Sequence, residues 1–67
     1  LAATARLARE AGVALEPGGL LALEVDVRRA SVVAELLATH GAYDQVQVVL
    51  DLTGRERFVV ARRREAE

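Results

Sequence analysis

The fold is decided by a turn and the strand after it, which together read Glu16-Pro17-Gly18-Gly19-Leu20-Leu21-Ala22-Leu23-Glu24-Val25. Proline at the second position and glycine at the third favour a type II turn, because the third residue of that turn needs a positive φ. The residues after the turn are largely apolar without alternation, which is typical of a strand covered on both faces. The stretch therefore predicts a strand over residues 20–25 in an α/β sheet.

Helical patterns lie on both sides of this strand. Residues 1–12 are rich in helix formers with one apolar stripe, and Gly12 is a common helix stop. Residues 28–40 carry apolar side chains at helical spacing, and Asp26 or Ser31 can cap their start. The apolar positions of this second helix are Val32, Val33, Leu36 and Leu37. The first strand, this helix and the next strand then form a right-handed unit with parallel strands.

Two further strands follow the second helix. Residues 45–50 alternate, with Gln45 and Gln47 on one side, which is typical of an edge strand with a wetter face. Residues 57–62 are apolar on both faces in their middle, as in an interior strand, and the short turn between the two strands makes them antiparallel. We therefore predict an α/β fold of helix, strand, helix, strand and strand. Its sheet order is first, third, second, with the last strand antiparallel to both neighbours.

Composition excludes several function classes. The 67 residues allow one domain at most, and nine basic against ten acidic residues give a net charge of −1. This balance argues against nucleic acid or an anionic membrane surface as a partner. No uncharged stretch reaches the roughly 20 residues that span a bilayer. With no cysteine and one histidine, the sequence also predicts no disulfide and no metal site, and the default location is cytoplasmic.

Three motifs resemble the C-terminal part of the HemK/PrmC methyltransferases. They are Leu15-Glu16-Pro17-Gly18-Gly19-Leu20-Leu21-Ala22-Leu23-Glu24, the helix end His40-Gly41 with Tyr43, and Asp51-Leu52-Thr53-Gly54-Arg55-Glu56-Arg57 followed by Phe58-Val59-Val60-Ala61. The resemblance implies a Rossmann-like sheet of seven strands, whose last strand is antiparallel and inserted between the fifth and sixth. It also implies an enzyme that transfers a methyl group from S-adenosylmethionine to a glutamine amide of release factors. The chain departs from the family at Val25-Asp26-Val27-Arg28-Arg29, where the family usually has a Gly and then a Gln.

The motifs that carry the chemistry of that family are missing from this sequence. A Gly-X-Gly loop after a strand would let a backbone approach the cofactor, but the glycine pair Gly18-Gly19 precedes a strand. The sequence has no Asn, so the Asn-Pro-Pro-Tyr segment that holds the substrate amide in the family is also missing. We therefore predict no catalytic and no cofactor-binding residues, and no S-adenosylmethionine binding by this chain. Because the chain begins at Leu1 rather than Met, we expect its partner to be the missing N-terminal part of a parent enzyme.

Five charged residues form a candidate site at the carboxyl edge of the predicted sheet: Glu24, Asp26, Asp51, Arg55 and Arg57. The carboxyl ends of the first two strands meet at this edge, and the last hairpin grows from it. Open α/β sheets bind their ligands outside this edge. The alternative is an ion-pair network that holds the hairpin in place, with Arg57 between Glu24 and Asp51. We give the ion-pair interpretation more weight than the ligand site.

The resemblance also predicts self-association. In the family another strand flanks the strand that matches residues 20–25, so here that edge is free and apolar until Glu24. Both helices are expected on one face of the sheet, which leaves apolar side chains exposed on the other. We therefore expect a homo-oligomer, in which two copies pair their first strands antiparallel and bury residues 20–23.

Two function classes remain open from the sequence. In the first, the 67 residues are a single fragment of a glutamine methyltransferase of HemK type, structural in the parent and inactive alone. In the second, they form a small stand-alone αβαββ protein-interaction module without catalytic activity.

Overall fold

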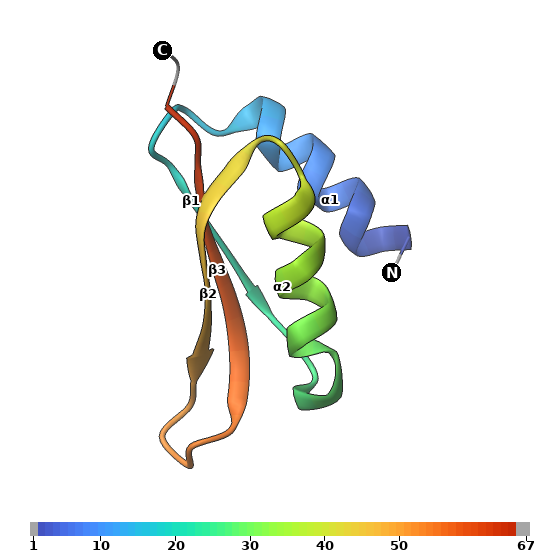
Figure 1. The fold of residues 1–67 in the computed structure, drawn as a ribbon, viewed down its shortest axis with the longest axis vertical. Coiled ribbons are helices and arrows are strands. Elements are labelled where there is room, and N and C mark those ends of the chain that lie inside the picture. The colour runs from blue at the N-terminus through green and yellow to red at the C-terminus, as the bar shows by residue number, and fades with distance from the viewer. Residues whose placement is uncertain (1, 66–67) are drawn as a thin grey trace.

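The computed structural model describes residues 2–65 and has two layers, with both helices on one face of a three-stranded sheet (Figure 1). The elements are α1 (Ala2–Ala14), β1 (Leu20–Glu24), a 3₁₀ turn η1 (Val27–Arg29), α2 (Ala30–Thr39), β2 (Tyr43–Leu50) and β3 (Glu56–Arg63). The strand order is β1-β3-β2, and β3 is antiparallel to both neighbours. The predicted element order, sheet order and strand directions are therefore confirmed.

The turn before β1 has the predicted chemistry. Gly18 has a φ of +85°, and the backbone N–H of Gly19 donates to the carbonyl oxygen of Glu16 at 2.8 Å. A residue with a side chain is strained at this φ, so glycine is needed at this position. The turn leads the chain directly from α1 into β1.

The core lies between the helices and the near face of the sheet. Val59 and Ala61 of β3 are fully buried against the helices, together with Val33 and Leu37 of α2. On the other face Leu20 is 66% exposed. Although its apolar pattern is typical of a strand covered on both faces, β1 is covered on one face only within the described residues, because both helices lie on the same side. That arrangement of the helices is the one expected from the right-handed connections.

β2 begins at Tyr43, two residues before the predicted start, and a β-bulge near this end interrupts the alternation of the strand. Gln45 has a φ of 50°, and the pairing with β3 shifts between Asp44 and Gln47. The extra residue reverses the alternation, so that Tyr43 and Val46 both face the helices. After the bulge the predicted alternation holds from Val46 to Val48, and a second register shift between Val49 and Leu50 ends it.

The second helix also begins later than predicted. Asp26 caps the short η1 turn, because its carboxylate accepts a hydrogen bond from the backbone N–H of Arg28. The α-helix itself runs from Ala30 to Thr39, and the N–H of His40 closes it on the carbonyl oxygens of Leu36 and Leu37. The first helix continues past Gly12 to Ala14, so the prediction that Gly12 ends it is wrong.

Gly12 instead allows a close approach between α1 and the start of β2. A Cβ at this position would lie 3.2 Å from the Cβ of Ala42. Two hydrogen bonds hold the helix at this contact: the Tyr43 hydroxyl donates to the carbonyl oxygen of Ala8 and Arg63 Nε donates to that of Gly12, each at 2.6 Å. Within residues 2–65 neither helix is long and apolar enough to cross a membrane.

Candidate functional site

The structure brings Glu24 and Arg57 together at the carboxyl edge of β1. Arg57 Nε lies 3.2 Å from Glu24 Oε2, and the two side chains are 53% and 66% exposed, respectively. The backbones also meet here, because the N–H of Val25 donates to the carbonyl oxygen of Arg57 at 2.8 Å. This pair lies largely in water, so its attraction is weakened by solvent.

Asp51 is occupied within its own turn. Its Oδ1 accepts hydrogen bonds from the backbone N–H and the hydroxyl of Thr53, at 2.8 and 2.6 Å, and from the N–H of Arg55 at 3.1 Å. The Thr53 hydroxyl bond, followed by the bond from the Arg55 N–H, holds the pKa of Asp51 below its usual range. The positive charge of Arg57 lowers this pKa further. Asp51 therefore shapes the hairpin turn, and among the ion pairs of the described residues Arg57 joins Glu24 alone.

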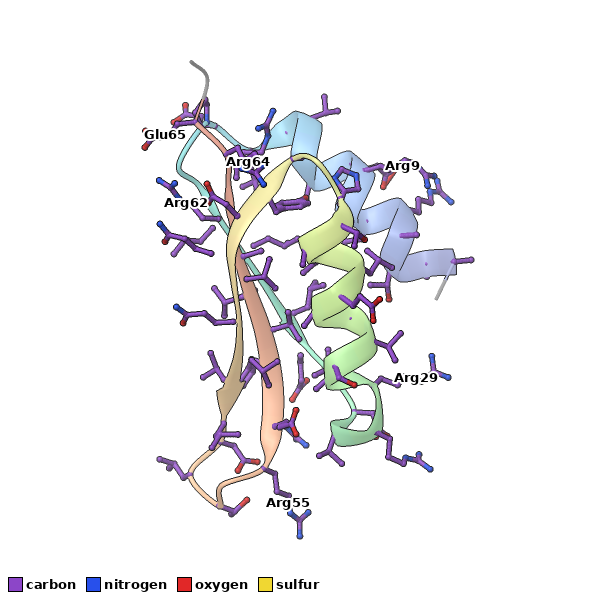
Figure 2. The ribbon with its side chains drawn as sticks, in the orientation of Figure 1. Arg9, Arg29, Arg55, Arg62, Arg64 and Glu65 are labelled. Atoms are coloured by element: carbon purple, nitrogen blue, oxygen red, sulfur yellow. The ribbon has the colours of Figure 1, made fainter. Side chains whose placement is uncertain are left out.

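The other two residues of the candidate site lie apart from this pair. Asp26 contacts Arg28, with Oδ1 3.2 Å from Nε and Oδ2 3.2 Å from Nη2. The hydrogen bond from the Arg28 side chain lowers the pKa of Asp26. Arg55 lies at the hairpin tip and its side chain points away from the sheet (Figure 2). The five residues thus share one edge of the sheet without forming a single network.

The arrangement of these five residues fits ion pairing better than catalysis. The charged groups of the candidate site are exposed, apart from the half-buried Asp51, and the cations are guanidinium groups, which do not deprotonate in proteins. A general base or nucleophile would need a partner that shifts its pKa toward neutrality, whereas the shifts of Asp26 and Asp51 are downward. In the described part of the chain, no group of three or more His, Cys, Asp or Glu residues is placed to hold a metal ion.

A hollow of about 210 Å³ lies beside the same edge, between α1, the end of β1 and α2. Most of the lining residues are apolar, and Thr4 and Glu24 are the polar residues among them. The lining residues are Ala3, Thr4, Leu7, Leu23, Glu24, Val25 and Val33. The sequence analysis missed this hollow, because it depends on how α1 packs against residues far away in the sequence.

Sequence reasoning also missed the ion pair between Asp44 and Arg62 on the open face of the sheet. The two are cross-strand partners, and two hydrogen bonds of 2.9 Å join the guanidinium Nε and Nη2 to the two carboxylate oxygens. Both side chains are only about a quarter exposed, at 26% and 27%. The hydrogen bonds from Arg62 hold the pKa of Asp44 below its usual range. This pair depends on the register that the bulge sets, and the sequence alone does not reveal that register.

Comparisons with known proteins identify relatives by sequence. No protein-family profile matches the chain, and no solved structure matches it. It is 56% identical over 57 residues to a release factor glutamine methyltransferase of Deinococcus radiodurans, covering 85% of this chain and 20% of that protein. It is 44% identical over 62 residues to the protein of the same name from Synechocystis, covering 92% and 21%, respectively. The protein of that name from Mycobacterium leprae is 42% identical over 66 residues, covering 98% and 23%.

These matches place this α/β chain among the methyltransferases. More particularly, all six matched proteins carry the same name, and the predicted resemblance to the C-terminal part of the release factor glutamine methyltransferases, the HemK/PrmC family, is confirmed. The chain therefore belongs to that family. It spans about a fifth of the length of the curated relatives that it matches.

Proposed function

We propose that this chain is a structural segment of an S-adenosylmethionine-dependent release factor glutamine methyltransferase, and that it is inactive alone. The observation that carries this proposal is the 56% identity to the Deinococcus radiodurans protein over 85% of the chain. In the proposal, the release factor is the substrate of the whole enzyme, and the rest of that enzyme is the partner of this segment. A cytoplasmic location, as expected from the sequence, belongs to the same proposal.

The placement of the helices supports a Rossmann-like sheet in the whole enzyme. The parallel strands β1 and β2 are joined through α2, and such connections are nearly always right-handed. α1 lies on the same face as α2 and leads into β1 (Figure 1). In the whole enzyme, a further strand beyond the free edge of β1 would be connected to β1 through α1. The chain would then cross the sheet in the same direction and over the same face as it does between β1 and β2, so this connection would also be right-handed. This geometry favours a larger parallel sheet that continues beyond β1.

The residues of the chain do not fit S-adenosylmethionine. The hollow at the end of β1 holds about 210 Å³. Pockets for ligands of this size measure roughly 300–1,000 Å³ and offer several converging polar groups. Glu24, the one charged residue in the lining of the hollow, pairs with Arg57. In the proposal, therefore, the rest of the enzyme supplies the cofactor site, and the charged edge of this segment holds the β2–β3 hairpin against β1.

A calorimetric titration tests the inactivity of the segment. The chain and the full-length Deinococcus radiodurans relative are each titrated with S-adenosylmethionine under the same conditions. We expect saturable heat from the full-length relative and none from the chain. Micromolar binding by the chain, or methyl transfer to a release factor by the chain alone, would refute the proposed structural role.

A further inference from the structure

The β2–β3 hairpin projects beyond the carboxyl edge of the sheet. Glu24, the last residue of β1, pairs with Phe58, whereas β2 and β3 continue together as far as Leu50 and Glu56. The turn that joins them lies farther out again, beyond the end of β1 (Figure 1). Since neighbouring strands are about 5 Å apart, a strand added next to β1 would lie roughly 10 Å from β3 and farther from β2. The free edge of β1 is therefore not the reason why this end of the hairpin is exposed.

Hydrogen bonds to Asp51 hold the end of the hairpin in one conformation. Besides the bonds that its carboxylate accepts from Thr53 and Arg55, its N–H donates to the carbonyl oxygen of Arg55 at 2.8 Å. Its own carbonyl oxygen accepts from the N–H of Gly54 at 3.0 Å, and Gly54 has a φ of +84°, which suits glycine. Ordered groups lose less conformational entropy on binding than mobile ones, so this turn is prepared for contact with a partner.

Apolar side chains face the solvent at residues 49–56, the hairpin tip. Leu52 is fully exposed and Leu50 is 56% exposed. Val49 and its cross-strand partner Phe58 are each more than a third exposed. Single exposed leucines are normal on a protein surface, but apolar side chains concentrated on one projecting element are typical of a protein-binding site.

Arg55 adds a cation to this apolar surface. Its side chain points away from the sheet (Figure 2), and none of the ion pairs among residues 2–65 includes it. A guanidinium group binds carboxylates with several N–H donors, and arginine is enriched at protein interfaces. The hairpin tip therefore suits a protein surface that combines an apolar depression with acidic groups.

We propose that the hairpin tip binds the release factor, the protein substrate of the whole enzyme, with Leu52 and Arg55 as its main contact residues. This inference rests on the proposed function, which supplies the identity of the substrate. Open α/β sheets bind their ligands outside the carboxyl edge, and the tip projects from that edge. An enzyme that modifies one side chain of a protein also contacts the protein surface around that side chain. The tip lies at the edge where this contact has to form.

The position of the tip also determines which kinetic constant it affects. It contacts the surface of the substrate and not the reacting atoms, so it stabilises the bound substrate and the transition state equally. Such uniform binding lowers KM and leaves kcat unchanged. Substitutions at the tip should therefore weaken binding of the release factor without changing kcat or the affinity for S-adenosylmethionine.

A chimera of the full-length Deinococcus radiodurans relative, in which this chain replaces the matching stretch of 57 residues, tests the proposal. Calorimetry measures the dissociation constant for the release factor of the same organism, and methyl transfer is measured separately. Leu52→Ser and Arg55→Gln should each raise this dissociation constant and KM about fivefold or more. The value of kcat, the binding of S-adenosylmethionine and the melting temperature should stay unchanged.

Val13→Ser is the matched control, because Val13 is 89% exposed and lies near the end of α1, at the opposite end of the sheet. It should bind the release factor like the unsubstituted chimera. An unchanged dissociation constant in both tip variants, an equal increase in Val13→Ser, or a chimera that does not bind the release factor would overturn the proposal. A lower melting temperature or weaker S-adenosylmethionine binding in Leu52→Ser would overturn it too, because the tip would then pack against the rest of the enzyme. Loss of methyl transfer in the unsubstituted chimera would count against the proposed function, whereas the dissociation constants would still decide the role of the tip.

Discussion

Replacing Tyr43 by Phe tests how α1 is held on the sheet. Tyr43 is 1% exposed, and its hydroxyl donates to the carbonyl oxygen of Ala8 at 2.6 Å. The substitution keeps the buried ring but removes this hydrogen bond. The Ala8 oxygen lies within α1 and can keep its intrahelical partner, so no buried acceptor is left without a bond. We therefore expect a loss of about 0.5–1.5 kcal/mol in the free energy of unfolding, the usual net value of one hydrogen bond.

Urea unfolding followed by circular dichroism at one fixed protein concentration measures this loss. Val13→Ala is the control in the same helix. Val13 is exposed, so this substitution should change the free energy of unfolding by less than about 0.5 kcal/mol.

Burial raises the pKa of Tyr43, so the folded state keeps the proton more tightly than the unfolded state. Stability should therefore fall as the pH rises above 10.0, the ordinary pKa, and this fall should be smaller in Tyr43→Phe. An unchanged midpoint and an unchanged alkaline profile in Tyr43→Phe would refute the role of this contact.

Three further experiments probe the bulge and the ion pairs. Gln45→Gly should stabilise the chain by roughly 0.5–1 kcal/mol in urea unfolding, because Gln45 has a φ of 50° and glycine adopts that conformation without strain; a loss of stability would show that the Gln45 side chain contributes more than the strain costs. A double-mutant cycle of Glu24→Ala and Arg57→Ala should give a coupling of about 0.2–1 kcal/mol, the range for exposed pairs, and zero coupling would reject the pair. Asp44 has a lowered pKa, so its stabilisation is present above 3.8 and is lost as the pH falls through the lowered value. Asp44→Asn should therefore flatten the acid side of the stability profile, and an unchanged profile would contradict the contribution of the pair with Arg62.

The fold was predictable where local sequence chemistry determines it. The Pro17-Gly18 pair marks the turn, and the short connection 51–55 makes β2 and β3 antiparallel, which leads directly to the observed sheet order. The bulge at Gln45 was not predictable, because no glycine or asparagine in the sequence marks a left-handed residue there. The contacts of Tyr43 with Ala8 and of Arg63 with Gly12 join residues 35 and 51 positions apart, and no periodic pattern reports such contacts.

The candidate site was predictable only in outline. Topology alone places the Glu24 and Arg57 side chains at one edge, and the structure brings them within 3.2 Å. The contacts of Asp51 have a local origin. The side chain of an aspartate at the start of a turn accepts a hydrogen bond from the backbone N–H two residues further along the chain. The sequence Asp51-Leu52-Thr53-Gly54 carries this signal, and it favours the local bonds to Thr53 over a bond to Arg57. Local hydrogen bonds thus explain why the five charged residues do not form one network.

Transfer of the segment into a whole enzyme tests the central claim most directly. The matching 57-residue stretch of the Deinococcus radiodurans relative is replaced by that of this chain, and methyl transfer to a release factor is measured for the chimera and for the intact relative. If the chain is a structural segment of this family, the chimera should transfer methyl groups at a rate close to that of the intact relative. A chimera that folds and binds S-adenosylmethionine but transfers no methyl group would contradict the account.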